Sequence, residues 1–219
     1  MTEIGLYEAM ATTRAVRRLR PDPVPEPVLR RVLEAATWAP SGGNRQAWRV
    51  IAVRDPATKR ALGELYMGPW TAYAARQRAQ LARLPETSRA TGERSLAAGD
   101  HLAAHLHAAP VIAVFCFQPE LLTITDAALP RPSVVGGASL YPAVQNLLLA
   151  CRAEGLGCVL TTLLCVVEER VRPLLGIPDP WATSAFVPIG YPVGRGHGPL
   201  ARKSVEAMTF ADHWGTPLF

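Results

Sequence analysis

Ala39-Pro40-Ser41-Gly42-Gly43-Asn44-Arg45-Gln46-Ala47-Trp48 is the stretch from which the fold of this 219-residue chain is best read. A helix-like run ends just before it, because proline lacks an N–H and restricts the residue that precedes it. The two glycines let backbone approach a flat ligand closely, and the hydroxyl and amide side chains offer both donors and acceptors. A strand-like apolar run, residues 50–53, follows. The stretch suits a heterocycle rimmed with nitrogen and oxygen, although an ordinary polar helix-to-strand turn has the same composition.

A second informative segment lies closer to the N-terminus. Thr12-Thr13-Arg14-Ala15-Val16-Arg17-Arg18-Leu19-Arg20 carries four arginines within seven residues, and a proline-rich turn follows it. The planar guanidinium is the side chain best fitted to bidentate phosphate binding. This segment therefore indicates a site for an anionic group.

Together the two segments resemble the opening signature of the FMN-dependent nitroreductase family. That family reads Arg-Arg-Ser-x-Arg-x-Phe near its N-terminus and Ala-Pro-Ser-x-x-Asn-x-Gln-Pro-Trp further on. Two later blocks also match: residues 145–150 leading into 155–162, and residues 188–192 followed by 201–205. The four blocks come in family order and span most of the chain.

The expected fold class is α+β, since helical patterns outnumber strand patterns and the two do not alternate regularly. The resemblance implies a nitroreductase-like fold: a central, mostly antiparallel sheet flanked by helices, in an intertwined homodimer with FMN at the subunit interface. Residues 1–219 are expected to form a single domain, because the length suits one core and no repeat or linker interrupts it.

Local patterns predict the individual elements, with Asp55 as the cap that begins one helix and Gly155 as the C-terminal cap of another. The expected strands are 48–53, 111–117, 159–162 and 184–189. The expected helices with two defined ends are 6–10, 26–38, 139–154 and 167–175. Between the first two strands we expect a helix from 55 to a break near 68–69, a helix over 70–91 that is interrupted at 84–87, and a further helix that ends near 107. Residues 119–137, with three prolines, are expected to be a long loop.

Two segments carry hypotheses about movement and assembly. Residues 70–91 are rich in Ala, Arg and Gln with few large apolar side chains, which suits either a mobile lid or a solvated surface helix. Residues 199–219 include Met208, Phe210, Trp214 and Phe219, too many large apolar groups to hang free in water. We therefore expect a C-terminal extension that lies over a partner subunit.

The resemblance also implies the site residues. The implied cofactor-binding residues are Arg14, Ala15, Arg17, Pro40, Ser41, Asn44, Thr161, Thr162 and Arg202. Among these, Arg14, Arg17 and Arg202 correspond to the phosphate partners, and Arg18 is the alternative if the match slips by one position. Gly42, Tyr66 and Trp70 are weaker candidates for contact with the substrate.

The chain departs from the family pattern at three positions of the matched motifs. Thr13 stands where the family often has arginine, and Ala15 stands where it often has serine, so a side-chain hydroxyl is lost at position 15. A backbone N–H there would still serve. Ala47 replaces the proline of the Gln-Pro-Trp step. The first two departures leave open a protein that binds flavin without turnover.

The function that the resemblance implies is an FMN-dependent NAD(P)H oxidoreductase. NADPH or NADH would be the reductant, a nitroaromatic, quinone or enone the acceptor, and the flavin rather than a catalytic side chain would carry the chemistry. Alternatives are a flavin-destructase or deiodinase-like reaction, and a non-catalytic protein that sequesters FMN or another ligand. Tyr66, Trp70 and Tyr73 come with few acidic or lysine ligands for a zwitterionic amino acid, which disfavours deiodination.

Composition narrows the class of partner and the compartment. A net charge of +5 and a pI near 9.3 favour anionic small molecules, whereas the dispersed arginines and missing reading motifs disfavour nucleic acid. No leader pattern or bilayer-length apolar run is evident, so no membrane partner and a cytoplasmic location are expected. The four cysteines form no Cys-x-x-Cys pair or metal-ligand cluster. Asp100, His101, His105 and His107 resemble a metal patch, since His101 and His105 are one helical turn apart, but no Glu follows His101 and no third ligand is evident, so no metal is expected.

Overall fold

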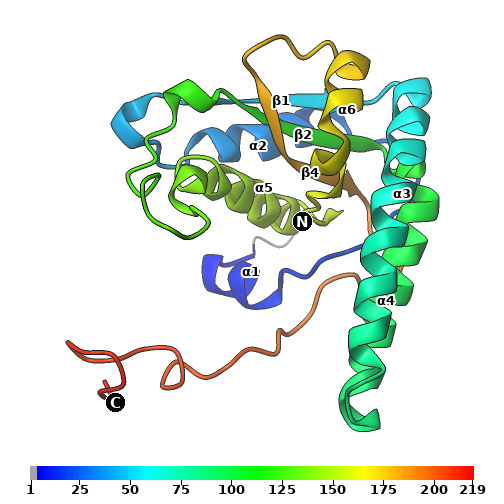
Figure 1. The fold of residues 1–219 in the computed structure, drawn as a ribbon. Coiled ribbons are helices and arrows are strands. Elements are labelled where there is room, and N and C mark those ends of the chain that lie inside the picture. Colours follow the sequence, from blue (N-terminus) through cyan, green and yellow to red (C-terminus); the bar gives the residue numbers. More distant parts are fainter. Residues whose placement is uncertain (1–3) are drawn as a thin grey trace.

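The structure is a computed structural model that describes residues 4–219 (Figure 1). At its centre lies a four-stranded sheet of order β1-β2-β4-β3. The strands are β1 Trp48–Val53, β2 Val111–Phe117, β3 Gly157–Cys158 and β4 Ala182–Gly190. All three pairings are antiparallel. The prediction of an α+β fold around an antiparallel sheet is confirmed, while the homodimer stays a prediction.

Helices cover both faces of the sheet. They are α1 Leu6–Thr12, α2 Glu26–Thr37, α3 Pro56–Leu81, α4 Glu86–His105, α5 Tyr141–Ala153 and α6 Glu168–Leu175. Short 3-10 turns occur at Gly42–Asn44, Leu106–Ala108, Pro119–Leu121, Val135–Gly137 and Leu163–Val167. The helices α2 and α5 pack on one face, and α3, α4 and α6 pack on the other.

The strand β2 contributes side chains to the hydrophobic clusters on both faces of the sheet. Val111, Ala113 and Phe115 point toward α2 and α5, whereas Ile112 and Val114 point toward α3 and α4. All five side chains are at most 2% exposed. A strand buried on both faces reads as a continuous apolar run, and successive side chains alternate between the two faces.

The helix predicted to break near residues 68–69 does not break there. The helix α3 continues through Pro69 to Leu81 and is 26 residues long. A proline inside a helix costs about 3 kcal/mol or more, because it removes a hydrogen bond and crowds the preceding turn. Beyond the proline, however, Trp70 and Ala74 are buried in the core. Their tertiary packing outweighs the local penalty.

The strand predicted over residues 159–162 is largely absent. The strand β3 is only Gly157–Cys158, and Thr161 returns to β4 through a single bridge with Phe186. The register is unbroken, since Cys158 faces Ile189 and Thr161 faces Phe186. Val159 would therefore face Pro188, which has no N–H to donate. The hydrogen bonding between the segment after β3 and β4 is interrupted at that proline.

Other local predictions are confirmed. Asp55 caps α3 by accepting a hydrogen bond from the backbone N–H of Thr58 at 2.7 Å. Gly155, at φ +72°, follows α5 and turns the chain so that Leu156 N–H donates to Cys151 at 2.7 Å. Between Pro119 and Gly137 the chain has only two short 3-10 turns, as expected of a long loop.

The C-terminal tail leaves the body of the molecule (Figure 1). Within residues 4–219, the hydrogen bonds of residues 201–219 join tail residues only to one another. Phe210 packs on Trp214 with ring centroids 4.9 Å apart, yet Trp214 is 92% exposed. None of the helices in the described part of the chain is long and apolar enough to cross a bilayer.

Candidate functional site

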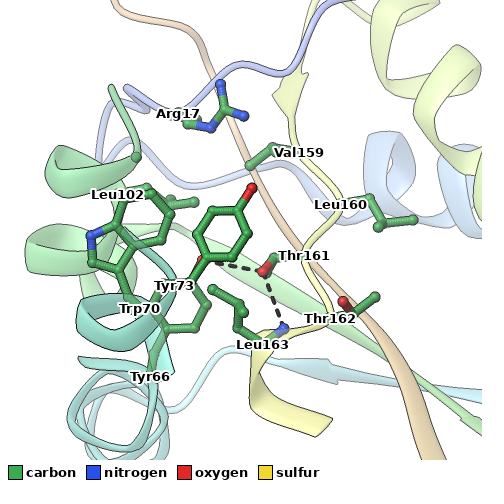
Figure 2. A pocket seen from close by; sticks show the side chains of 11 residues that line it. Arg17, Tyr66, Trp70, Tyr73, Leu102, Val159, Leu160, Thr161, Thr162 and Leu163 are labelled. Carbon is green, nitrogen blue, oxygen red and sulfur yellow. Dashed lines mark hydrogen bonds between the residues drawn. The ribbon is translucent and has the colours of Figure 1, made fainter. Parts of the chain in front are cut away.

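A cavity of about 220 Å³ opens between α3, α4 and the segment that follows β3 (Figure 2). Its lining residues are Arg17, Tyr66, Trp70, Tyr73, Gly99, Leu102, Val159, Leu160, Thr161, Thr162 and Leu163. Five of these were singled out from the sequence: Arg17, Tyr66, Trp70, Thr161 and Thr162. The fold thus brings together residues that lie up to 145 positions apart in the chain.

One wall of the cavity is aromatic. The rings of Tyr66 and Trp70 are nearly parallel, at 9°, with centroids 6.4 Å apart, and Trp70 lies 5.7 Å from Tyr73. The three residues are spaced four and three apart on α3, so they share one helix face. Tyr73 was not among the predicted site residues, although this helical spacing would have identified it.

A hydrogen bond joins the aromatic wall to the opposite segment. The phenol oxygen of Tyr66 lies 3.1 Å from Thr161 Oγ1, and the backbone N–H of Leu163 donates to the same hydroxyl at 3.4 Å. Burial raises the pKa of Tyr66. The phenol therefore stays protonated at neutral pH and remains a neutral donor or acceptor beside the cavity.

The indole of Trp70 is fixed from behind by α4. Its Nε1–H donates to Asp100 Oδ1 at 3.0 Å, and Arg78 donates to the other carboxylate oxygen at 2.5 Å. The ring lies directly on Gly99, where an added Cβ would come within 2.1 Å of Trp70 Cη2. Neither Asp100 nor Gly99 was predicted, because Trp70 lies 30 positions from Asp100 and 29 from Gly99.

Arg17 reaches the cavity because the segment around it is extended along the edge of the sheet. Val16 N–H donates to the carbonyl of Cys158 at 2.9 Å, and Arg20 N–H donates to that of Tyr191 at 2.8 Å. Neighbouring side chains of an extended chain point in opposite directions. Arg17 accordingly lines the cavity, whereas Arg18 contacts His101 Nδ1 at 3.2 Å.

The other predicted phosphate partners do not line this cavity. The exposed Arg14 donates to the carbonyl of Pro199 at 2.5 Å. Arg202 is exposed and donates to the carbonyl of its neighbour Ala201. Ala15 is exposed, and its backbone forms a bridge with Cys158.

The loop Pro40, Ser41, Gly42 and Asn44 also lies outside the cavity lining. The loop is held by Ser41 Oγ, which accepts from Gln46 N–H at 2.9 Å, and by Gly42 N–H, which donates to Ser139 Oγ at 3.0 Å. Asn44 and Gln46 both adopt positive φ, 52° and 48°. Such strained non-glycine backbone is uncommon and concentrates at functional sites.

The histidine cluster of α4 holds no recognisable metal site. His101 and His105 stack with ring centroids 4.2 Å apart, and His105 Nδ1 lies 2.8 Å from the carbonyl of His101. Across residues 4–219, no three His, Cys, Asp or Glu side chains gather in a way that would hold a metal ion.

Comparisons with known proteins agree on one family. The sequence profile described as "Nitroreductase family" matches residues 10–191. An "NADH dehydrogenase" of Thermus thermophilus is 38% identical over 197 residues, 89% of this chain and 90% of that protein. A "5,6-dimethylbenzimidazole synthase" of Rhodospirillum rubrum is 32% identical over 191 residues, 86% of this chain and 82% of that one. The crystal structure of a nitroreductase with bound FMN from Desulfitobacterium hafniense matches with a TM-score of 0.66 and 19% identity, covering 94% of this chain and 97% of that one.

Proposed function

This chain belongs to the nitroreductase family, and we propose that it is an FMN-dependent oxidoreductase. It would take hydride from NADPH or NADH and pass it to an electron-poor acceptor such as a nitroaromatic, a quinone or an enone. The observation that carries this proposal is the cavity in which the Arg17 guanidinium, two threonines and the aromatic face of α3 converge. The similarity to an "NADH dehydrogenase" across nine-tenths of the chain supports the same reaction class.

The chemistry of the cavity fits FMN. A flavin needs cationic donors for its phosphate, polar groups for its pyrimidine edge and apolar surface for its ring. Arg17 supplies the first, the hydroxyls of Thr161 and Thr162 the second, and Trp70 with Leu102 the third. The buried, neutral phenol of Tyr66 holds Thr161 in place without adding a charge. When bound, FMN would supply a hydride acceptor that becomes a hydride donor.

The size of the cavity supports a site that two subunits complete. Small-molecule sites commonly enclose about 300 to 1,000 Å³. The cavity of one chain measures about 220 Å³ and is not lined by Pro40, Ser41 or Asn44 among the described residues. We therefore assign these three residues to the site of a second copy. The exposed aromatic groups of the tail suit the same homodimer.

Each cofactor would then be held between one surface of each of two subunits. Arg14, Arg17 and Arg202 of one copy would bind the phosphate, and the backbone near Thr161 would face the ring. The strained loop of the other copy would close the site from the opposite side. The loop is exposed and is held in a fixed shape by the hydrogen bonds of Gln46 with Ser41 and Asn44, which suits contact with a flat ligand.

An absorbance spectrum of the purified protein, followed by anaerobic addition of NADPH and then NADH, tests the proposal. A yellow protein that bleaches with either nucleotide supports it. A yellow protein that dithionite bleaches but neither nucleotide does would instead support a sequestering role. A colourless protein that also fails to bind added FMN would overturn the flavin site itself.

A second reaction has specific support. The similarity to a "5,6-dimethylbenzimidazole synthase" at 32% identity covers most of both chains. A flavin-destroying reaction would appear as an oxygen-dependent, irreversible loss of flavin absorbance after reduction. Reversible bleaching, in which air restores the full spectrum over repeated cycles, would exclude that alternative.

A further inference from the structure

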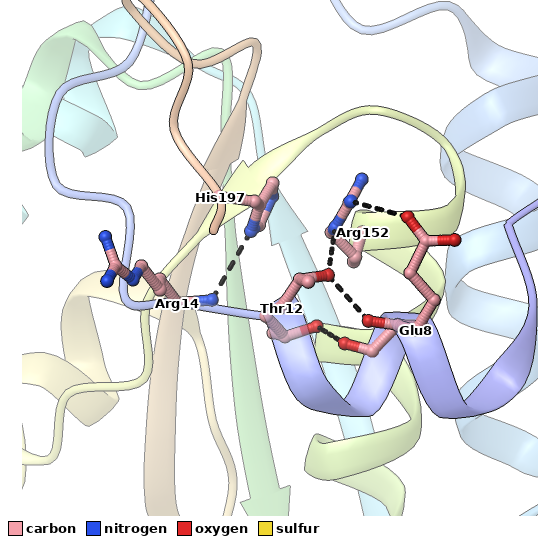
Figure 3. A network of polar contacts seen from close by, with 7 residues as sticks. Glu8, Thr12, Arg14, Arg152 and His197 are labelled. Carbon is pink, nitrogen blue, oxygen red and sulfur yellow. Dashed lines mark hydrogen bonds and ion pairs between the residues drawn. The ribbon is translucent and has the colours of Figure 1, made fainter. Parts of the chain in front are cut away.

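The segment His197–Pro199 clamps the backbone and the side chain of Arg14, and Figure 3 shows the backbone contact with His197. Arg14 N–H donates to His197 Nδ1 at 3.4 Å, and its guanidinium donates to the carbonyl of Pro199 at 2.5 Å. Between these contacts, Gly198 N–H donates to the carbonyl of Thr12 at 3.0 Å. Three consecutive residues thus hold Thr12 and Arg14 from the other end of the chain.

The partners of His197 define its protonation. Nε2 lies 2.8 Å from the carbonyl oxygen of Leu156, which only accepts, so Nε2 carries the proton. The N–H of Arg14 only donates, so Nδ1 carries none. The imidazole is 7% exposed. A single neutral tautomer therefore satisfies both of its buried contacts, and the opposite tautomer would satisfy neither.

The charges around the imidazole also favour its neutral form. Burial lowers the pKa of His197 and the nearby Arg152 lowers it further, against the hydrogen bond to Leu156. Arg152 is held in place by Thr12 Oγ1 at 3.0 Å and lies 3.9 Å from a carboxylate oxygen of Glu8 (Figure 3). The neutral ring is thus an uncharged acceptor between two arginines.

The clamp leaves most of the Arg14 guanidinium available. A guanidinium has five N–H donors in a fixed fork, and Pro199 takes one of them. The remaining donors lie on an exposed side chain whose backbone is fixed. An arginine prepared in this way loses less conformational freedom when it binds an anion.

We propose that His197 is a positioning residue that orients Arg14 toward the flavin phosphate and so sets the preference for FMN over riboflavin. This inference rests on the proposed function. Riboflavin shares the ring and ribityl chain of FMN but lacks the phosphate. A residue that acts through Arg14 affects the binding of FMN and leaves that of riboflavin unchanged.

The test is titration of the full-length, flavin-free protein with FMN and with riboflavin, followed by fluorescence quenching. In Arg14→Gln the preference for FMN should fall about tenfold or more, the value of a charged hydrogen bond. In His197→Gln, whose amide N–H retains the contact with Leu156 but offers no acceptor to Arg14, it should fall about two- to tenfold. In His197→Asn, whose amide oxygen replaces Nδ1, it should stay within about twofold of wild type.

The double variant separates positioning from general support of the fold. Arg14→Gln combined with His197→Gln should lose no more FMN preference than Arg14→Gln alone, since the histidine acts through that arginine. Equal weakening of FMN and riboflavin in His197→Gln, or full additivity in the double variant, would overturn the inference while the proposed function stands. A wild-type protein that binds neither flavin would overturn the proposed function and the inference with it.

A measurement on the unchanged protein tests the inference without any variant. Long-range nitrogen–proton correlation spectra distinguish the two neutral histidine tautomers and the imidazolium. At neutral pH we expect His197 with its proton on Nε2. A proton on Nδ1 would leave no acceptor for Arg14 N–H and would refute the positioning role.

Discussion

The phenol oxygen of Tyr66 lies 3.1 Å from the hydroxyl of Thr161, and this contact ties α3 to the segment that follows β3. It closes the side of the cavity at which the β3–β4 ladder is interrupted. The hydrogen bond from α3 therefore holds Thr161 where the missing ladder hydrogen bonds of the sheet do not. The shape of the site depends on it.

Tyr66→Phe removes this hydrogen bond and keeps the ring. We expect the free energy of unfolding to fall by about 1 kcal/mol, the net value of a buried neutral hydrogen bond. Tyr73→Phe, on the same wall but 36% exposed, is the matched control and should change it by less than about 0.5 kcal/mol. Urea unfolding of both variants measures the difference, and equal losses would contradict the assigned role of the Tyr66 hydroxyl.

Gly99→Ala forces the indole of Trp70 away from α4, because the new Cβ would lie 2.1 Å from its ring. Overpacking of this kind costs about 1 to 3 kcal/mol. We also expect weaker FMN binding, since the displaced ring has to enter the cavity. Gly63→Ala on α3 is the control, with its Cβ 3.8 Å from His107, and should stabilise the helix by up to about 1 kcal/mol. Thermal unfolding that ranks the two variants in the opposite order would refute this packing argument.

Arg17 and Arg18 provide a pair of substitutions with the same change in charge. Arg17→Gln should weaken FMN binding about tenfold or more, because the lost group lines the cavity. Arg18→Gln removes a contact with His101 and should change FMN affinity less than about twofold. Titration of both flavin-free variants with FMN decides the matter. Equal effects would indicate long-range electrostatics instead of a direct contact.

Removal of residues 204–219 keeps Arg202 and takes away the exposed aromatic groups of the tail. The full-length chain should sediment as a dimer, and the shortened chain should dissociate at higher protein concentration, because the apolar surface that the tail covers is lost. Sedimentation velocity over a dilution series measures the change. A full-length chain that sediments as a monomer at every concentration would contradict the homodimer.

Acid should lower the free energy of unfolding over the pH range in which His197 takes up a proton. Burial lowers the pKa of His197, so the unfolded chain binds a proton more readily than the folded one. Stability is therefore complete above the ordinary histidine pKa of about 6.5 and falls as the pH drops through the lower, folded value. His101, whose pKa is lowered by burial and by Arg18, acts in the same direction, but from a more exposed position.

Unfolding of wild type and His197→Gln over a series of pH values tests this sign. The variant should be less stable at neutral pH, yet its stability should depend less on pH across the histidine window. A wild-type protein whose stability rises on acidification would contradict the assignment of a neutral buried imidazole. The carboxylates with lowered pKa values, such as that of Asp55 held by Thr58, act at still lower pH.

Local chemistry in the sequence predicted the elements, and tertiary contacts decided the exceptions. Asp55 and Gly155 were identified as helix ends because their roles depend on adjacent residues. Pro69 was misread because the packing of Trp70 against α4 is not visible in the sequence. The strand over residues 159–162 failed for a similar reason, since the proline that interrupts it belongs to β4.

The site shows the same division. The motifs led to Arg17, Thr161 and Thr162, which the fold gathers around one cavity. In an extended segment, Arg17 and Arg18 point in opposite directions. The pairing of Val16 with Cys158 decides which of the two faces the cavity. Asp100 and His197 were missed because each works through a partner far away in the chain.

The distance between the Pro40–Asn44 loop and the cavity has a thermodynamic consequence. If one flavin spans both, on two copies of the chain, cofactor binding and subunit association become linked equilibria. The factor by which bound flavin strengthens subunit association equals the factor by which association strengthens flavin binding, because such coupling is reciprocal. Dilution would then release cofactor and subunits together, and a shortage of flavin would shift the chains toward separated subunits.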